Sequence, residues 1–228
     1  MSIQELWAKK KPPTQSQIDI IYEQMAATIK VFNRAGINYH IIAGSALGQA
    51  RCGGLIPWDD DVDFGIHRDD AANMWNQREY LGSLGYGIVH ADIGFRMGTG
   101  GIIPELLTDV DGTPTAVGAG TKPFTGVNQD IFLFNENGSE NGIPVMRYSS
   151  KRAIETWPRE VIPVKGWYSP TDVIFGGYNV KIPSKKYLDW YLEYAYGENW
   201  KTHDGFGNEI SKVPCALHSS IMSTNINK

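Results

Sequence analysis

The most informative stretch of this chain reads Ile41-Ile42-Ala43-Gly44-Ser45-Ala46-Leu47-Gly48-Gln49-Ala50-Arg51-Cys52-Gly53-Gly54-Leu55-Ile56-Pro57-Trp58-Asp59-Asp60-Asp61-Val62-Asp63-Phe64-Gly65. Its first residues are apolar and predict a strand that ends at Gly44-Ser45. A short helix-compatible piece follows and ends at a double glycine, and Trp58 then leads into four acids within five positions. The order predicts a strand, a turn, a helix and a second strand.

The acids after Trp58 alternate with apolar residues. Val62 separates Asp61 from Asp63, and Phe64 follows. Side chains of a strand alternate between its two faces, so Asp61 and Asp63 would project together while Val62 and Phe64 face the core. Two neighbouring carboxylates repel each other unless a cation lies between them, and hard oxygen ligands suit Mg²⁺ or Mn²⁺. We therefore expect a divalent metal site.

The turn at Gly44 and Ser45 opens the predicted helix. Backbone amides at a helix N-terminus can bind a phosphate oxygen, so these two residues are candidates for phosphate binding. A phosphate-binding turn that faces a paired-carboxylate metal site is an arrangement suited to phosphoryl or nucleotidyl transfer.

A calcium loop is the main alternative interpretation of the acids. EF-hand positions 1, 3, 5 and 12 would be filled by Asp59, Asp61, Asp63 and Asp70. However, Phe64 stands where the loop requires glycine, and Pro57 interrupts the incoming helix. The calcium motif therefore fails at two points.

The stretch from Gly44 to Gly65 resembles the signature of the LicD/fukutin-related family, with Gly-Gly-x-Ile-Pro-Trp-Asp-Asp-Asp as its most specific part. One departure is Cys52, where the family usually has histidine. The resemblance implies a nucleotidyltransferase-like fold, and a transfer of phosphocholine or phospho-alditol groups from a CDP-activated donor to a glycan or glycolipid acceptor.

A third carboxylate is expected from a separate strand. Val127 to Phe134 reads as that strand, and it carries Asp130 in an apolar setting. The Asp-Ile-Phe sequence there matches the family. We expect Asp61, Asp63 and Asp130 to hold Mg²⁺ (or Mn²⁺), with Asp130 sharing the metal or taking the proton from the acceptor hydroxyl.

Several other residues are candidates for donor binding. Trp58 belongs to the signature, and Arg51 could reach a donor phosphate or could instead pair with Asp59 or Asp60. These two acids could also cap the turn or coordinate the metal through water. Some cations of the middle region should neutralise the pyrophosphate, and the candidates are Arg96, Lys122, Arg147, Lys151 and Arg152.

The remaining sequence predicts an α/β (α+β) fold with a small mixed sheet, flanking helices and a loop-rich C-terminal portion. A capping box at Ser16 begins a helix from about Gln17 to Arg34. A second helix runs from Asp69 or Asp70 to Gly82 or Gly85. From Gly85 to Gly126 the sequence is rich in Gly, Thr and Pro, with short apolar pieces at 86–89 and 93–97. We expect a long loop region there, which is a candidate lid or binding loop, although a disordered insertion would have the same composition. Later elements are a polar turn at 135–142, a hairpin at Gly176-Gly177 and a helix from Ser184 to Gly197.

We expect residues 1–228 to form a single catalytic domain, with a core over about 16–135, a C-terminal elaboration over about 136–200 and a polar tail over about 202–228. The net charge of −4 argues against a nucleic-acid-binding protein. The 2 cysteines allow at most one disulfide. No apolar run is long enough for a membrane span, and a cytoplasmic location is the default expectation.

Two alternative functions stay open. A nucleotidyltransferase would use the same Gly-Ser turn and Asp-x-Asp site to attach NMP from ATP or CTP, and it would differ only in which half of the donor it keeps. A binding module with a degenerate active site is also possible, although the retention of all three predicted carboxylates argues against it.

Overall fold

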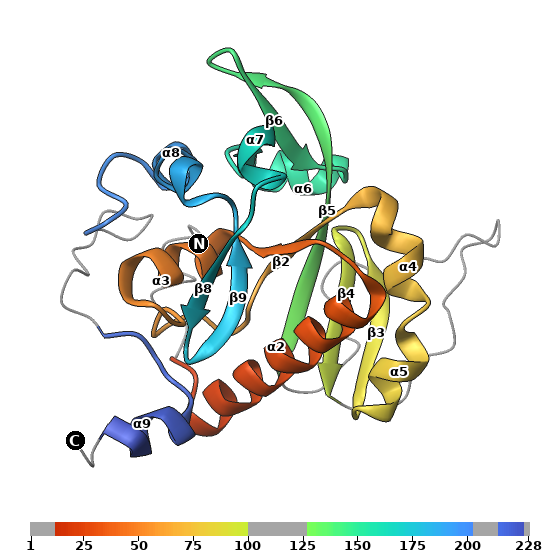
Figure 1. Ribbon diagram of the computed structural model, residues 1–228, viewed down its shortest axis with the longest axis vertical. Helices are drawn as coiled ribbons and strands as arrows, with labels where there is room; N and C mark the ends of the chain where they lie inside the picture. Colours follow the sequence, from red (N-terminus) through yellow and green to blue (C-terminus); the bar gives the residue numbers. More distant parts are fainter. Residues whose placement is uncertain (1–11, 100–126, 203–213, 226–228) are drawn as a thin grey trace, which may run out of the picture.

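The computed structural model describes residues 12–99, 127–202 and 214–225. These residues form a mixed sheet flanked by helices (Figure 1), which confirms the predicted fold class. The seven strands of this sheet are β1 (Tyr39–Ile41), β2 (Phe64–His67), β3 (Tyr86–Ala91), β4 (Gly94–Thr99), β5 (Asn128–Glu140), β6 (Ile143–Tyr148) and β7 (Val161–Pro163). A separate two-stranded sheet pairs β8 (Thr171–Phe175) with β9 (Tyr178–Ile182).

The strands of the main sheet lie in the order β1-β2-β5-β4-β3. β2 runs parallel to β5, whereas β1, β4 and β3 each run antiparallel to their neighbours. The distal half of β5 pairs with β6, and this hairpin stands out from the body of the molecule (Figure 1). β5 is therefore the strand on which both the core sheet and the projecting hairpin are built.

The helices that the structure describes are α2 (Gln15–Ala35), α3 (Ala43–Cys52), α4 (Ala71–Trp75), α5 (Arg78–Ser83), α6 (Lys151–Thr156), α7 (Val164–Trp167), α8 (Lys185–Tyr196) and α9 (Ser219–Asn225), with a 3-10 turn at Arg68–Asp70. The first predicted helix is confirmed, but its capping box uses Thr14 and Gln17 instead of Ser16. None of these described helices has both the length and the apolar character that a membrane span requires.

The prediction that the first two strands lie side by side is confirmed, because Tyr39 pairs with Ile66 and Ile41 with Phe64. The predicted start of the second strand at Asp61 is wrong. β2 begins at Phe64, and the acids lie in the loop before it. Val62 and Phe64 are nevertheless fully buried, so the apolar half of the alternation packs inward as expected.

Two other predicted boundaries are wrong. The helix expected from Asp69 or Asp70 to Gly82 or Gly85 is divided into the 3-10 turn, α4 and α5. The chain does reverse within the polar turn expected over 135–142, since β5 and β6 form a hairpin, but the turn is much shorter: β5 continues to Glu140, and the reversal is at Asn141 and Gly142, both with positive φ.

The prediction of a loop from Gly85 to Gly126 is wrong for its first part. Residues 86–99 form the β3–β4 hairpin, and β4 pairs with β5, so this region extends the sheet. The lid interpretation of residues 100–126 lies outside the described residues.

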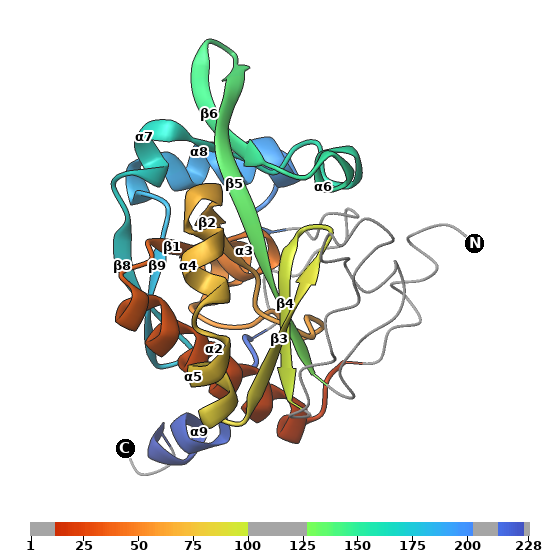
Figure 2. The same cartoon turned by 90° about the vertical axis from the view of Figure 1, so that its right-hand side faces the viewer.

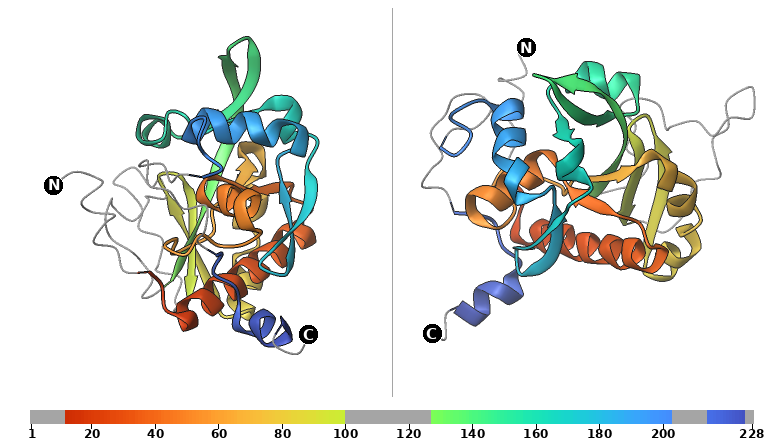
Figure 3. Two further views of the ribbon diagram at one scale, coloured as in Figure 1. Left: turned by 90° about the vertical axis from the view of Figure 1, so that its left-hand side faces the viewer. Right: turned by 45° about the horizontal axis from the view of Figure 1, so that its top comes forward.

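The C-terminal portion holds more regular structure than its sequence suggests. The hairpin at Gly176-Gly177 is confirmed by the pairing of Phe175 with Tyr178. α8 spans Lys185–Tyr196, so the predicted helix between Ser184 and Gly197 is confirmed, although the side chain of Ser184 makes no capping hydrogen bond. α8 lies beside α3 (Figure 3), which brings the C-terminal third of the sequence against the Gly-Ser turn.

The two faces of β5 have different surroundings. Gln129 faces α2, because its Oε1 accepts a hydrogen bond from Thr28 at 2.5 Å. Side chains alternate along a strand, so Asp130 projects from the opposite face. α2 crosses the sheet on the first face (Figure 2), and the candidate site is built on the other.

Candidate active site

Three acids predicted from sequence come together in the structure. Asp61, Asp63 and Asp130 each offer an oxygen, and these oxygens lie within 4.8 Å of one another. The parallel pairing of β2 with β5 explains the convergence, because Phe64 is in register with Ile131. Asp63 and Asp130 immediately precede this pair, so they lie side by side, Asp63 just before β2 and Asp130 near the start of β5.

The backbone of Asp63 is held by the start of the Gly-Ser segment. Its N–H donates to Oγ of Ser45 at 2.9 Å, and its carbonyl accepts from the N–H of Ile42 at 3.0 Å. Ser45 is buried. The contact that the structure gives to Ser45 therefore positions a candidate metal ligand, and its binding of donor phosphate stays a prediction.

The Asp63 carboxyl group lies in a strongly negative environment. Burial raises its pKa well above the usual range, and the charges of Asp61, Asp130, Asp59 and Glu160 raise it further, in that order. Such a group is costly to ionise without a nearby cation.

Gly44 and Asp59 are in close contact at the beginning of α3. A Cβ atom built on Gly44 would lie 2.7 Å from Oδ2 of Asp59, so a larger residue here would displace the Asp59 carboxylate. A carboxylate at a helix N-terminus is favoured by the helix dipole. Asp59, Asp60 and Asp61 also form a second group of oxygens within 4.8 Å. Asp59 thus occupies the surroundings where the sequence predicts a donor phosphate, and that role of Gly44 stays a prediction.

Arg96 is a positively charged residue that contacts one of the three clustered acids. It is the cross-strand neighbour of Asp130. Its Nε donates to Oδ1 of Asp130 at 2.7 Å and its Nη2 donates to Oδ2 at 2.9 Å. This is a bidentate pair of the kind that fixes orientation as well as charge. Both side chains line a cavity of about 200 Å³, whose other lining residues are Pro13, Gln17, Asp60, Asp61, Val127 and Asn128.

The structure shows Arg51 in contact with the C-terminal third of the chain and Trp58 in contact with the hydrophobic core. The Nε of Arg51 donates to the carbonyl of Trp200 at 2.6 Å, which directs this part of the guanidinium toward the end of the C-terminal region. Trp58 is partly buried and packs against the hydrophobic core. Donor binding by either residue stays a prediction.

A buried network from the C-terminal third reaches the Gly-Ser turn, and sequence reasoning missed it. The backbone N–H of Ala43 donates to the hydroxyl of Tyr191 at 2.8 Å, and this hydroxyl donates to Oε2 of Glu160 at 2.5 Å. Ala43 has a φ of 49°, which is unusual for a residue with a side chain. Burial raises the pKa of Glu160 to about 7, although hydrogen bonds from Tyr191 and Tyr196 oppose the shift.

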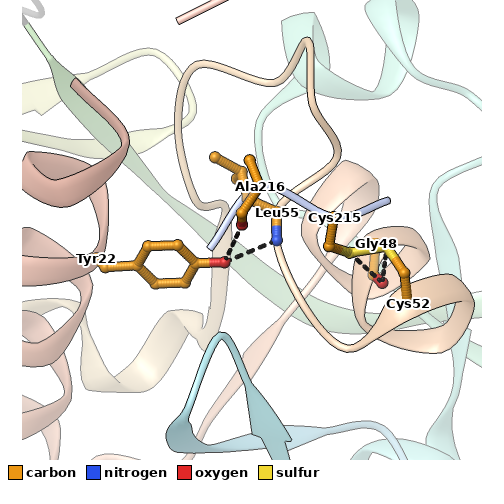
Figure 4. The surroundings of a disulfide bond; sticks show 6 residues. All are labelled: Tyr22, Gly48, Cys52, Leu55, Cys215 and Ala216. Atoms are coloured by element: carbon orange, nitrogen blue, oxygen red, sulfur yellow. Dashed lines mark hydrogen bonds between the residues drawn. A yellow bond between two sulfur atoms is a disulfide. The ribbon is translucent and has the colours of Figure 1, made fainter. Parts of the chain in front are cut away.

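The opposite end of α3 is joined to the C-terminal segment by a disulfide between Cys52 and Cys215 (Figure 4). The hydroxyl of Tyr22 accepts from the N–H of Leu55 at 2.9 Å and donates to the carbonyl of Ala216 at 2.8 Å. Leu55 and Ala216 also form an isolated β-bridge. Both ends of α3 are therefore held by residues distant in sequence.

The three clustered carboxylates have the chemistry of a magnesium or manganese site. All the donors are oxygens, which hard divalent cations prefer. Burial, and then the charges of the neighbouring acids, raise the pKa of Asp63, and a cation would favour its charged form. The residues present therefore fit the predicted metal.

Comparison with known proteins places part of this site in a family. Residues 36–104 match the model of the LicD/FKTN/FKRP nucleotidyltransferase domain. The resemblance found in the sequence is therefore confirmed. The matched residues 36–104, which we call the LicD-type segment, contain the Gly-Ser turn, the acid loop and Arg96. Asp130, Glu160 and Tyr191 lie beyond this segment.

Individual relatives also match over part of the chain. The ribitol 5-phosphate transferases FKRP of Mus musculus and Homo sapiens are each 49% identical over 45 residues, which is 20% of this chain and 9% of theirs. An uncharacterized protein of Rickettsia typhi, RT0683, is 36% identical over 73 residues, covering 32% of this chain and 24% of its own. The alignments thus span less than a quarter of these relatives' lengths.

A solved structure of ANT(2'')-Ia in complex with adenylyl-2''-tobramycin aligns with 75% of this chain and 74% of its own. Its sequence identity is 15% and its TM-score is 0.39.

Proposed function

We propose that this chain is a metal-dependent phosphotransferase that moves a phosphocholine or phospho-alditol group from a CDP-activated donor to a glycan acceptor. The observation that carries the proposal is the convergence of Asp61, Asp63 and Asp130 within 4.8 Å. The match of residues 36–104 to the LicD/FKTN/FKRP model and the partial similarity to FKRP support the same reaction class.

In this proposal, Asp61, Asp63 and Asp130 hold Mg²⁺ or Mn²⁺. When bound, the ion neutralises charge on the donor's phosphates. The chain itself supplies position: Ser45 and Ile42 hold the backbone of Asp63, and Arg96 holds both oxygens of Asp130. We assign Asp130 the metal-sharing role, because its carboxylate lies with those of Asp61 and Asp63 in the group whose oxygens are within 4.8 Å of one another.

The proposed transfer does not require a strong general base. A loose phosphoryl-transfer transition state develops little bonding to the attacking hydroxyl, so positioning and electrostatic stabilisation carry most of the rate. A site with closely grouped carboxylates and a guanidinium beside them is suited to that task.

Thermal stabilisation by candidate donors tests the proposal. The panel contains CDP-choline, CDP-ribitol, CDP-glycerol, CTP and ATP, each with and without Mg²⁺, because selective binding to the folded state raises its stability by mass action. A Mg²⁺-dependent shift with one CDP-linked compound, followed by transfer to an acceptor, is the expected result. A shift with CTP or ATP alone would favour nucleotidyl transfer, the activity in the family model's description.

Asp63→Asn is the deciding variant. We expect turnover to fall by at least roughly 100-fold, in the range seen when a key electrostatic group is removed. The variant should still fold, because removing one of the clustered charges relieves repulsion. Asp172→Asn is the matched control, since Asp172 is exposed and pairs with Lys181 on the separate β8–β9 sheet. Full activity of Asp63→Asn would refute the proposal.

A further inference from the structure

Arg96 differs in its surroundings from the other cations that the sequence offered for phosphate binding. Lys122 lies outside the described residues, and the remaining candidates have acidic partners elsewhere: Arg147 pairs with Glu140, Lys151 with Glu155, and Arg152 with Asp92. Arg96 alone among these described candidates pairs with one of the three clustered carboxylates.

The geometry of the Arg96–Asp130 pair leaves part of the guanidinium available. Its two hydrogen bonds use Nε and Nη2, and a guanidinium carries five N–H groups. Within the part of the chain that the structure describes, the side chain of Arg96 makes no other hydrogen bond. Its side chain is 29% exposed and that of Asp130 is 15% exposed. The guanidinium is therefore held in a fixed orientation while part of it remains accessible.

The cavity beside this pair brings positive and negative groups together. Asp60 and Asp61 line it along with Arg96 and Asp130. A cavity lined by metal-ligand carboxylates and one oriented guanidinium suits an anion that arrives with a divalent cation, as the pyrophosphate of a nucleotide donor does.

We propose that Arg96 is a donor-phosphate-binding residue of this site, held in position by Asp130. The assignment rests on the proposed function. Asp130 has about four lone-pair sites, so accepting two hydrogen bonds from Arg96 still leaves it able to share a metal. Asp130 would thus hold both the cation and Arg96, and a donor diphosphate would be bound by the two together.

Binding measurements can separate this role from a purely structural one. We would titrate wild-type protein and Arg96→Gln first with Mn²⁺ alone and then with the Mn²⁺ complex of inorganic pyrophosphate, using calorimetry. Arg96→Gln should bind Mn²⁺ at least as tightly as wild type, because a positive charge next to the carboxylates is gone. Its affinity for Mn²⁺-pyrophosphate should fall by roughly 10- to 100-fold, since charge-assisted hydrogen bonds are lost.

Two further variants support the comparison. Arg96→Lys keeps the charge but not the planar fork, so its pyrophosphate affinity should be intermediate. Arg152→Gln is the matched control, because it removes another arginine–aspartate pair, with Asp92, and should leave both affinities unchanged. If Arg96→Gln does not fold, as judged by its melting transition, the comparison is made with Arg96→Lys alone.

The outcomes distinguish this assignment from the proposed function. Equal pyrophosphate affinity in wild type and Arg96→Gln would overturn the assignment alone, as would a parallel loss of Mn²⁺ and pyrophosphate binding. Failure of the wild-type protein to bind Mn²⁺-pyrophosphate would overturn both. Pyrophosphate binding that depends on Arg96, with no transfer from any donor, would uphold the assignment and remove only the proposed reaction.

Discussion

Removal of the Cys52–Cys215 disulfide should lower the stability of the folded chain substantially. The two cysteines are separated by 163 residues, so the bond closes a very long loop. In the chain-entropy model a loop of this size contributes about 5 kcal/mol at 25 °C by restricting the unfolded state. Measured values are usually smaller, and we expect a loss of about 2–4 kcal/mol. For a domain of ordinary stability that is a large fraction of the total.

The contacts around the disulfide should keep the segment in place after reduction. Tyr22 still bridges Leu55 and Ala216 in a reduced protein, because neither of its hydrogen bonds involves sulfur (Figure 4). The effect should therefore act mainly on the unfolded state, and the folded structure should be retained.

Urea unfolding, with and without a reductant, measures the loss. Oxidised wild type should have a higher midpoint than reduced wild type, whereas the Cys52→Ser/Cys215→Ser double variant should match the reduced protein under both conditions. Thiol titration in denaturant should find no free thiols before reduction and two afterwards. Identical midpoints for wild type and double variant under oxidising conditions would refute the reasoning.

Two further predictions concern groups near the site. Because the folded-state pKa of Glu160 is about 7 against an ordinary 4.5, the folded protein binds this proton more tightly than the unfolded chain. As the pH rises from about 4.5 to 7, the free energy of unfolding should therefore fall by up to about 3 kcal/mol. Glu160→Gln should make the urea midpoint less dependent on pH. A variant with the pH dependence of wild type would contradict this. Gly44→Ala should destabilise by at most about 1 kcal/mol, since its Cβ would meet Oδ2 of Asp59 at 2.7 Å and this carboxylate has to shift. Gly82→Ala, with nothing within 4 Å, is the control and should be neutral or stabilising in thermal melts, so equal melting temperatures for the two variants would count against the contact.

The sequence predicted those parts of the fold that depend on local pattern. The apolar stripe of α2, the Gly176-Gly177 turn and the Gly197 stop of α8 all follow from residue types at fixed spacing. The same reasoning selected three acids that the structure brings together, although Asp61 and Asp63 precede the strand on which they were expected. Alternation alone could not place the start of β2.

The missed features depend on contacts between distant residues. Arg96 and Asp130 meet because β4 and β5 pair in one particular register, and no local pattern specifies that register. Tyr191 is one of the buried residues of α8, together with Leu188 and Leu192, and its position on the helix indicates packing. Only the arrangement of α8 beside α3 shows that its hydroxyl also reaches Ala43 and Glu160.

The supports of α3 connect the predicted core to the rest of the chain. Its first residue, Ala43, is held by Tyr191, and Arg51 near its end donates to the carbonyl of Trp200. Its last residue, Cys52, is bonded to Cys215. All three supports come from residues beyond about position 135, where we placed the end of the core, and beyond the LicD-type segment.

α3 carries Ser45, which positions Asp63. The C-terminal residues are therefore part of what holds the carboxylates together. A chain shortened to the predicted core would keep Asp61, Asp63 and Asp130 in its sequence, but it would lose the contacts with Tyr191, Trp200 and Cys215 that hold the helix behind them.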